Sequence, residues 1–100
     1  MRKRTYNICI PVFNEEQNLE ALLENLRAFL KKNSTKDTFN IVFYDDGSTD
    51  NTLEILNKHK DIVVIEGIEN KGLGHSIKEL FDYSVSRNVD GIFKLDGDNQ

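Results

Sequence analysis

The chain has a single cysteine, and this scarcity excludes two kinds of stabilisation. Cys9 is the one thiol among its 100 residues, so no internal disulfide can form. A zinc site built on paired Cys-x-x-Cys motifs is excluded for the same reason. A lone thiol inside an apolar run is typical of a core residue in a reducing compartment. The sequence therefore predicts a cytoplasmic protein, with a position at the cytoplasmic face of a membrane as the alternative.

Long apolar runs and excess positive charge are also missing. The longest apolar run covers residues 8–13, far fewer than the roughly 18–20 residues that a membrane helix needs. Thirteen Lys and Arg stand against 17 Asp and Glu, a net charge of −4, which argues against a nucleic-acid partner. Membrane contact is expected only through parts that are not in this chain. A hydrophobic content of 38% with 30% charged residues is typical of one globular domain.

Apolar residues alternate between strand spacing and helix spacing along the whole chain. Strands are predicted at 6–12, 39–44, 62–66 and 92–95. Helices are predicted at 14–32, where Asn14 would be the N-cap, at 51–59, and from 73 to about 85. The inner face of the third helix is expected to carry Leu73, Ile77, Leu80, Phe81 and Val85. Such alternation predicts an α/β fold, a Rossmann-like parallel sheet in strand order 3-2-1-4 with helices on both faces.

Acidic residues follow three of the four predicted strands. In a parallel sheet these positions share one edge, and the residues concerned are Glu15, Glu16, Asp45, Asp46, Asp50, Asp96 and Asp98. Carboxylates that converge repel one another unless a cation lies among them, and Mg²⁺ or Mn²⁺ prefers such oxygen ligands together with phosphate oxygens. Each pair taken alone is equally typical of turns. The whole set favours a metal-dependent diphosphate site.

Four motifs, in this order and at this spacing, resemble the family 2 glycosyltransferases, which have the GT-A fold. The resemblance is closest to the dolichyl- or polyprenyl-phosphate sugar synthases. It implies that residues 1–100 form a single domain, which is the N-terminal, donor-binding half of a GT-A domain and therefore an incomplete GT-A fold. The motifs are Pro11-Val12-Phe13-Asn14-Glu15, Asp45-Asp46-Gly47-Ser48-Thr49-Asp50, Asn70-Lys71-Gly72-Leu73-Gly74 and Asp96-Gly97-Asp98-Asn99-Gln100.

The resemblance also implies roles for individual residues. Residues of the first motif would contact the base and ribose of a nucleotide sugar, Asp46 would bind the nucleotide, and Asp45 would support the turn. The Asp-x-Asp motif would bind ribose and metal, with Asp98 as the direct metal ligand. The implied donor-site residues are Pro11, Phe13, Glu15, Asp45, Asp46, Asp96, Gly97 and Asp98, and the implied metal ligands are Asp98, Asp96 and Gln100.

Two functions remain open at this point. The first is a glycosyltransferase domain that binds a UDP- or GDP-sugar with Mg²⁺ or Mn²⁺ and transfers the sugar to a polyprenyl phosphate, a saccharide or a protein. The second is a nucleotide-binding module without transferase activity, because no residue here matches the family's acceptor-site residues or general base. A dinucleotide oxidoreductase is disfavoured, since no Gly-x-Gly-x-x-Gly follows the first strand.

Overall fold

The computed structural model describes residues 2–97, which form four strands and three helices in alternation. Their bounds are β1 Thr5–Val12, α1 Leu19–Asn33, β2 Thr38–Asp45, α2 Thr52–Asn57, β3 Val63–Glu66, α3 Leu73–Ser86 and β4 Gly91–Lys94. Each predicted element is present, with ends that differ by a few residues. Within residues 2–97, no helix has the length and apolar character that crossing a bilayer would require.

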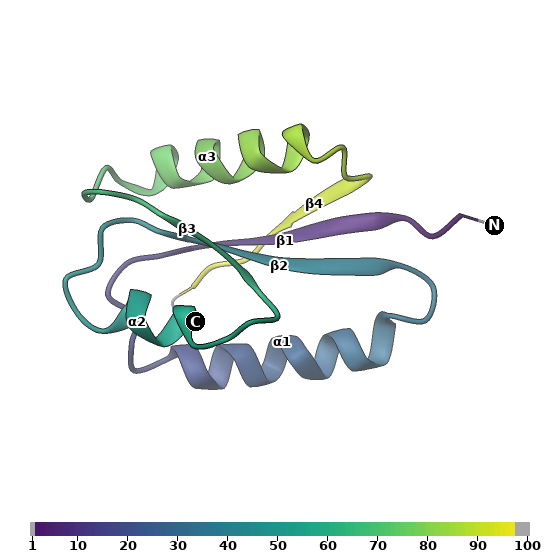
Figure 1. Ribbon diagram of the computed structural model, residues 1–100, viewed down its shortest axis with the longest axis horizontal. Coiled ribbons are helices and arrows are strands. Elements are labelled where there is room, and N and C mark those ends of the chain that lie inside the picture. Colours follow the sequence, from purple (N-terminus) through teal and green to yellow (C-terminus); the bar gives the residue numbers. More distant parts are fainter. Residues whose placement is uncertain (1, 98–100) are drawn as a thin grey trace.

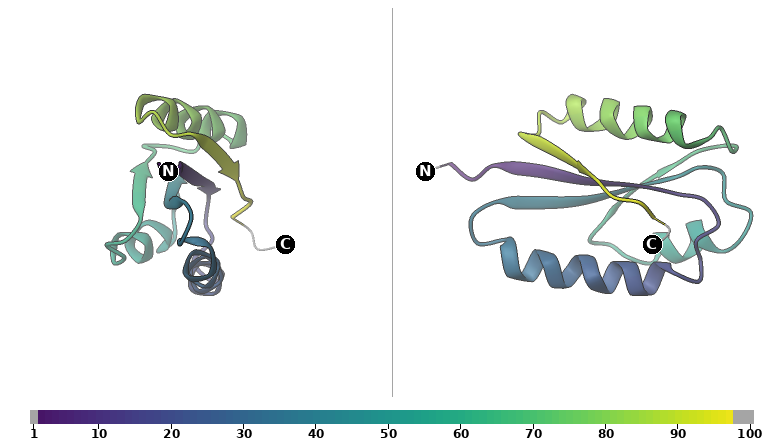
Figure 2. Two further views of the ribbon diagram at one scale, coloured as in Figure 1. Left: turned by 90° about the vertical axis from the view of Figure 1, so that its right-hand side faces the viewer. Right: turned by 180° about the vertical axis from the view of Figure 1, so that it is seen from behind.

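The four strands form one parallel sheet in the order β3-β2-β1-β4, which confirms the predicted order. β1 pairs with β2 along its whole length and with β4 over Tyr6–Cys9. α3 covers one face of the sheet, whereas α1 and α2 lie on the other (Figures 1 and 2). The loops that follow β1, β2 and β3 therefore gather at one end of the molecule, at the left in Figure 1.

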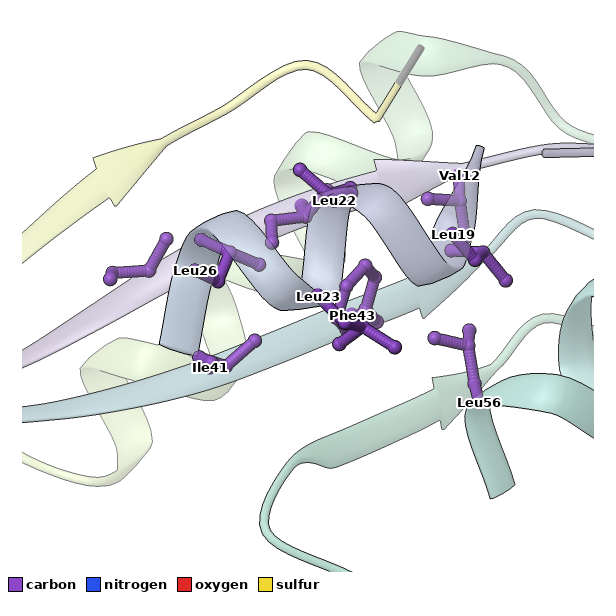
Figure 3. Packing of buried hydrophobic residues seen from close by; sticks show 10 residues of the cluster. Val12, Leu19, Leu22, Leu23, Leu26, Ile41, Phe43 and Leu56 are labelled. Atoms are coloured by element: carbon purple, nitrogen blue, oxygen red, sulfur yellow. The ribbon is translucent and has the colours of Figure 1, made fainter. Parts of the chain in front are cut away.

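The larger core lies between α1 and the sheet. Leucines at helical spacing on α1 face buried side chains of β1 and β2, and Leu56 of α2 closes the end of this layer (Figure 3). Phe43 and Leu23 are completely buried there, so each stabilises the fold by about 1.5–3 kcal/mol relative to exposure. This packing joins α1 and α2 to β1 and β2, the two strands whose carboxyl ends carry the loops described below.

The inner face of α3 differs from the prediction. Ser76, Leu80 and Ser84 are its buried residues, whereas Leu73, Phe81 and Val85 are exposed. The physical reason is the polar pairing beneath the helix. The Ser84 hydroxyl accepts a hydrogen bond from Asn7 Nδ2 at 3.0 Å and lies 3.4 Å from the thiol of Cys9. Burial raises the pKa of that thiol, and its complete burial confirms Cys9 as a core residue.

The start of α1 also differs from the prediction, because Asn14 is not its N-cap. α1 begins at Leu19, and Asn14 has the left-handed φ of +53°. Its side-chain oxygen instead accepts the backbone N–H of Thr49 at 2.8 Å and that of Asp50 at 3.3 Å. Asn14 thus joins the loop after β1 to the loop after β2.

Candidate functional site

A cavity of about 260 Å³ opens where β1 and β2 end and α3 begins. It brings together three segments that are far apart in the sequence: the first motif, the turn after β2 and the start of α3. Its lining residues are Pro11, Val12, Phe13, Asp46, Asn70, Gly72, Leu73 and Ser76. Phe13 is 41% exposed, so its ring is available to a ligand. Three of the predicted donor-site residues, Pro11, Phe13 and Asp46, therefore share one cavity.

Asp46 is the charged residue of this cavity, and both of its carboxylate oxygens accept backbone hydrogen bonds. The N–H of Lys71 donates to Oδ1 and the N–H of Gly72 donates to Oδ2, each at 2.9 Å. The residue is 4% exposed. Hydrogen bonds to a charged acceptor are the stronger kind, so Asp46 fixes the backbone at the start of α3.

The turn after β2 contacts the same loop at two further points. The N–H of Gly67 donates to the carbonyl of Asp45 at 2.7 Å. Gly47 has a φ of +72°, and a Cβ on it would lie 2.5 Å from the backbone nitrogen of Asn70. Only glycine allows the two loops to approach this closely. Asp45 is buried and accepts hydrogen bonds from the hydroxyl and the backbone N–H of Ser48, which places it in the support of the turn.

Other acidic residues of this edge hold loops together instead of lining the cavity. Glu15 accepts a hydrogen bond from Asn18 Nδ2 at 3.0 Å, and Glu16 accepts the N–H of Asn51 at 3.3 Å. The structure thus places the Glu15 carboxylate on its own loop, outside the cavity lining.

Asp50 has the same kind of role in the turn after β2. Its carboxylate accepts hydrogen bonds from the hydroxyl and the N–H of Thr52, at 2.5 and 2.9 Å, and from the N–H of Glu16 at 3.4 Å. Desolvation by burial raises its pKa, but the hydrogen bonds from Thr52 and Glu16 outweigh it and leave the pKa below its usual value. The carboxylate therefore remains charged and joins two loops at neutral pH.

The fourth motif reaches the same edge through a close contact of Gly97. A Cβ on Gly97 would lie 2.6 Å from the carbonyl oxygen of Pro11 and from a methyl group of Val12, so glycine lets this segment pack on the end of β1. The neighbouring Asp96 side chain is 70% exposed and forms an ion pair with Lys94 at 3.3 Å.

The predicted metal ligands are only partly within the described residues. Asp98 and Gln100 lie outside them. Within residues 2–97, no three His, Cys, Asp or Glu side chains converge as a metal site would require. The exposed carboxylate of Asp96 has the chemistry that Mg²⁺ or Mn²⁺ prefers, and the metal site stays a prediction.

A second hollow, of about 430 Å³, lies on the other side of the β3–α3 loop. Tyr44 and His75 line it, with their rings edge to face and 6.1 Å apart. Burial, together with the charges of Glu79, Asp46 and Asp45, raises the pKa of Tyr44, so its hydroxyl stays protonated. His75 lines this hollow and is not among the residues that line the cavity at Phe13.

The sequence does not identify Ser76 as a lining residue, and it offers Asn70 and Leu73 only as members of the third motif. Ser76, Leu80 and Ser84 recur every four residues, which is helical spacing, but two of them are polar and hide the pattern. Asn70 and Leu73 flank the two residues whose N–H groups donate to Asp46, a contact between distant segments that the third motif alone does not reveal.

Together, the parallel sheet and the neighbouring strands β1 and β4 define an α/β protein of the Rossmann-like class, with a cavity at the carboxyl ends of its strands. The sequence matches the model of the family described as Glycosyl transferase family 2 over residues 7–100. The chain belongs to this family, and its fold agrees with a part of the GT-A fold.

Curated relatives support the same assignment. A dolichyl-phosphate beta-glucosyltransferase of Drosophila melanogaster is 32% identical over 81 residues, covering 72% of this chain and 25% of the relative. An undecaprenyl-phosphate 4-deoxy-4-formamido-L-arabinose transferase of Pseudomonas fluorescens is 35% identical over 97 residues, covering 94% and 28%. A poly(ribitol-phosphate) beta-glucosyltransferase of Bacillus spizizenii is 37% identical over 70 residues, covering 66% and 11%. The chain thus spans between about a tenth and three tenths of the length of these relatives.

Proposed function

We propose that this chain binds the nucleotide part of a UDP- or GDP-sugar together with Mg²⁺ or Mn²⁺, and that it serves the transfer of the sugar to a polyprenyl phosphate. The observation that carries the proposal is the cavity at Phe13 and Asp46, which unites residues of three family motifs. Family membership supports glycosyl transfer as the reaction.

The chemistry of the cavity favours the nucleoside over the diphosphate. Pro11, Phe13 and Leu73 give it an apolar wall on which a flat base can pack. The buried carboxylate of Asp46 repels phosphate and attracts N–H donors, which uracil and guanine both carry. We therefore place the base near Asp46 and the diphosphate toward the segment of Asp96.

The divalent ion would be held by Asp96, Asp98 and Gln100. When bound, such an ion stabilises the negative charge that develops on a leaving diphosphate. Gly97 supports this placement, because its contact with Pro11 brings the segment of Asp96 beside the cavity.

The acceptor of the sugar is inferred from the names of the relatives. Two of the three are named for dolichyl or undecaprenyl phosphate, and the third for poly(ribitol phosphate). A phosphate-bearing acceptor is common to all three names. The two longer matches favour the polyprenyl phosphate.

The test is the thermal stability of the full chain with UDP and with GDP, each with and without Mn²⁺. A ligand at about 100 times its dissociation constant adds about 2.7 kcal/mol, which raises the melting temperature of a domain of this size by roughly 10–20 °C. The proposal predicts that one of the two nucleotides raises the melting temperature and that Mn²⁺ enlarges this rise. A cooperative melt that neither nucleotide shifts would refute it, and a shift that is unaffected by Mn²⁺ would favour a nucleotide-binding module without transfer chemistry.

A further inference from the structure

The second hollow lies between α3 and the loop that joins β3 to α3, residues 67–72. Its volume of about 430 Å³ is large enough for a small organic ligand. We propose that this hollow binds an alkylammonium group, the chemistry of a lysine side chain or of a free polyamine, through the hydroxyl of Tyr44 and the carboxylate of Glu79. The inference does not rest on the proposed nucleotide site, because no residue lines both the hollow and the cavity at Phe13.

Tyr44 supplies the hollow with a polar group that the protein leaves unpaired. The residue is 5% exposed, and among the described residues no hydrogen bond involves its hydroxyl. No completely buried side-chain oxygen or nitrogen in residues 2–97 lacks a partner, so this hydroxyl is not sealed in the core. It therefore opens on the hollow that Tyr44 lines, where a ligand can pair with it.

The backbone of Gly67 passes directly beside this hydroxyl. A Cβ on Gly67 would lie 2.8 Å from the phenol oxygen of Tyr44 and 2.7 Å from the carbonyl oxygen of Asp45. Any other residue would press its side chain against the hydroxyl and close it off from the hollow. Glycine thus keeps the polar group of Tyr44 accessible.

Carboxylates outnumber lysines around the hollow. Glu66 at the end of β3, Glu69 in the loop and Glu79 on α3 line it, together with Lys71. Burial raises the pKa of Tyr44 and the negative charge of Glu79 raises it further, so the hydroxyl is neutral and lies in a negative field. Such a field repels phosphate and attracts a cation.

The arrangement favours an organic cation over a metal ion. In the part of the chain that the structure describes, no three His, Cys, Asp or Glu side chains converge closely enough to hold a metal. An ammonium group has three N–H donors, which suit separate acceptors such as the oxygens of Tyr44 and Glu79. Ile65 and Ile68 give the hollow an apolar wall on which the carbon chain can pack, and Ile68 is otherwise completely exposed.

The first experiment maps binding on the full, isotope-labelled chain by amide chemical shifts, with cadaverine as the probe at constant pH and salt. Pentanediol is the matched control ligand, because it has the same carbon chain without the charges. We expect saturable changes in residues 65–69, His75 and Glu79 with cadaverine and none with pentanediol. The absence of saturable changes there, or equal changes with both compounds, would overturn the inference.

The second experiment titrates variants with cadaverine. Tyr44→Phe removes a hydroxyl that no described residue bonds, so the variant should fold like wild type and bind about tenfold more weakly. Glu79→Gln should weaken binding about threefold, because it removes one charge of a partly exposed pair.

Two matched controls carry the same chemical changes away from the hollow. Tyr83→Phe, on α3, and Glu54→Gln, at an exposed position of α2, should bind cadaverine like wild type. Wild-type affinity in a folded Tyr44→Phe would overturn the inference. So would equal affinity of Glu79→Gln and Glu54→Gln, a comparison that does not depend on the folding of Tyr44→Phe.

A third titration distinguishes the two sources of the ammonium group. It compares pentylamine with lysine that is blocked at its α-amino and carboxyl groups, since each carries one positive charge. Tighter binding of the blocked lysine would support the inference and assign the hollow to a lysine side chain of a protein partner. Equal or tighter binding of pentylamine would support it and assign the hollow to a free amine, and binding of neither compound would overturn it.

Discussion

Replacing Gly47 by alanine tests the contact that joins the two loops of the site. Gly47 has a φ of +72°, and an alanine there costs about 1–2 kcal/mol through its backbone alone. Its Cβ would also lie 2.5 Å from the backbone nitrogen of Asn70 and from the carbonyl carbon of Glu69. Neither atom belongs to a flexible side chain, so the loop itself must move, a strain of the kind that costs about 1–3 kcal/mol. We expect a total loss of about 3 kcal/mol of unfolding free energy.

The assay is urea unfolding followed by circular dichroism, with Asn88→Ala as the control. Asn88 also has a positive φ, +56°, but lies in an exposed turn between α3 and β4. Asn88→Ala should therefore lose about 1 kcal/mol or less, from the backbone alone. The melting temperature of Gly47→Ala should fall by roughly 10–20 °C. If Gly47→Ala lost no more stability than Asn88→Ala, the close approach of the two loops would contribute nothing and the reasoning would be refuted.

Three further predictions follow from individual residues. Gly74→Ala should raise the unfolding free energy by about 0.5–1 kcal/mol in the same urea assay, because Gly74 lies in the first turn of α3 with open space at its Cβ position; a loss of stability would contradict this. Hydrogen bonds from the N–H of Thr5 and from Arg2 lower the pKa of Asp90, so the stability it contributes is present above its usual pKa and is lost as the pH falls. The unfolding free energy, measured from about pH 5 to pH 3, should fall less steeply in Asp90→Asn than in wild type. Identical slopes would show that the lowered pKa of Asp90 contributes nothing to stability. Asp98→Ala should abolish the enhancement of nucleotide binding by Mn²⁺ while the far-ultraviolet spectrum stays unchanged, and equal Mn²⁺ stimulation in both proteins would remove Asp98 from the metal site.

The order of elements and of strands could be predicted because they depend on local patterns. The spacing of apolar residues separates strands from helices, and right-handed crossovers leave few ways to arrange four parallel strands. β2 was recognisable from its nearly continuous apolar run, and five of its eight residues are indeed buried in a row. The family also followed from the four motifs, since their order and spacing lie in the sequence itself.

The details of the site depend on contacts between distant residues and could not be predicted in the same way. Asn14 has the composition of an N-cap, but its side chain pairs with a turn 35 residues away. The inner face of α3 carries serines because Asn7 and Cys9 lie beneath it, and no pattern within the helix reveals that. The clustered acids predicted a metal site, but the carboxylates of Asp50 and Glu16 accept hydrogen bonds that join the loop after β1 to the loop after β2. Asp46 was singled out from sequence, but its hold on the β3–α3 loop is a tertiary contact.

The central claim, that the cavity at Phe13 and Asp46 binds a nucleotide, is tested most directly by mapping amide chemical shifts of the labelled chain. UDP or GDP would be added with Mg²⁺, which is diamagnetic, until the shifts saturate. The account predicts that the changes concentrate in residues 12–13, 46–48 and 70–76, which surround the cavity. Saturable changes confined to the apolar groove between α1 and β4, lined by Leu22, Phe29 and Phe93, would contradict it. So would the absence of any change at millimolar nucleotide.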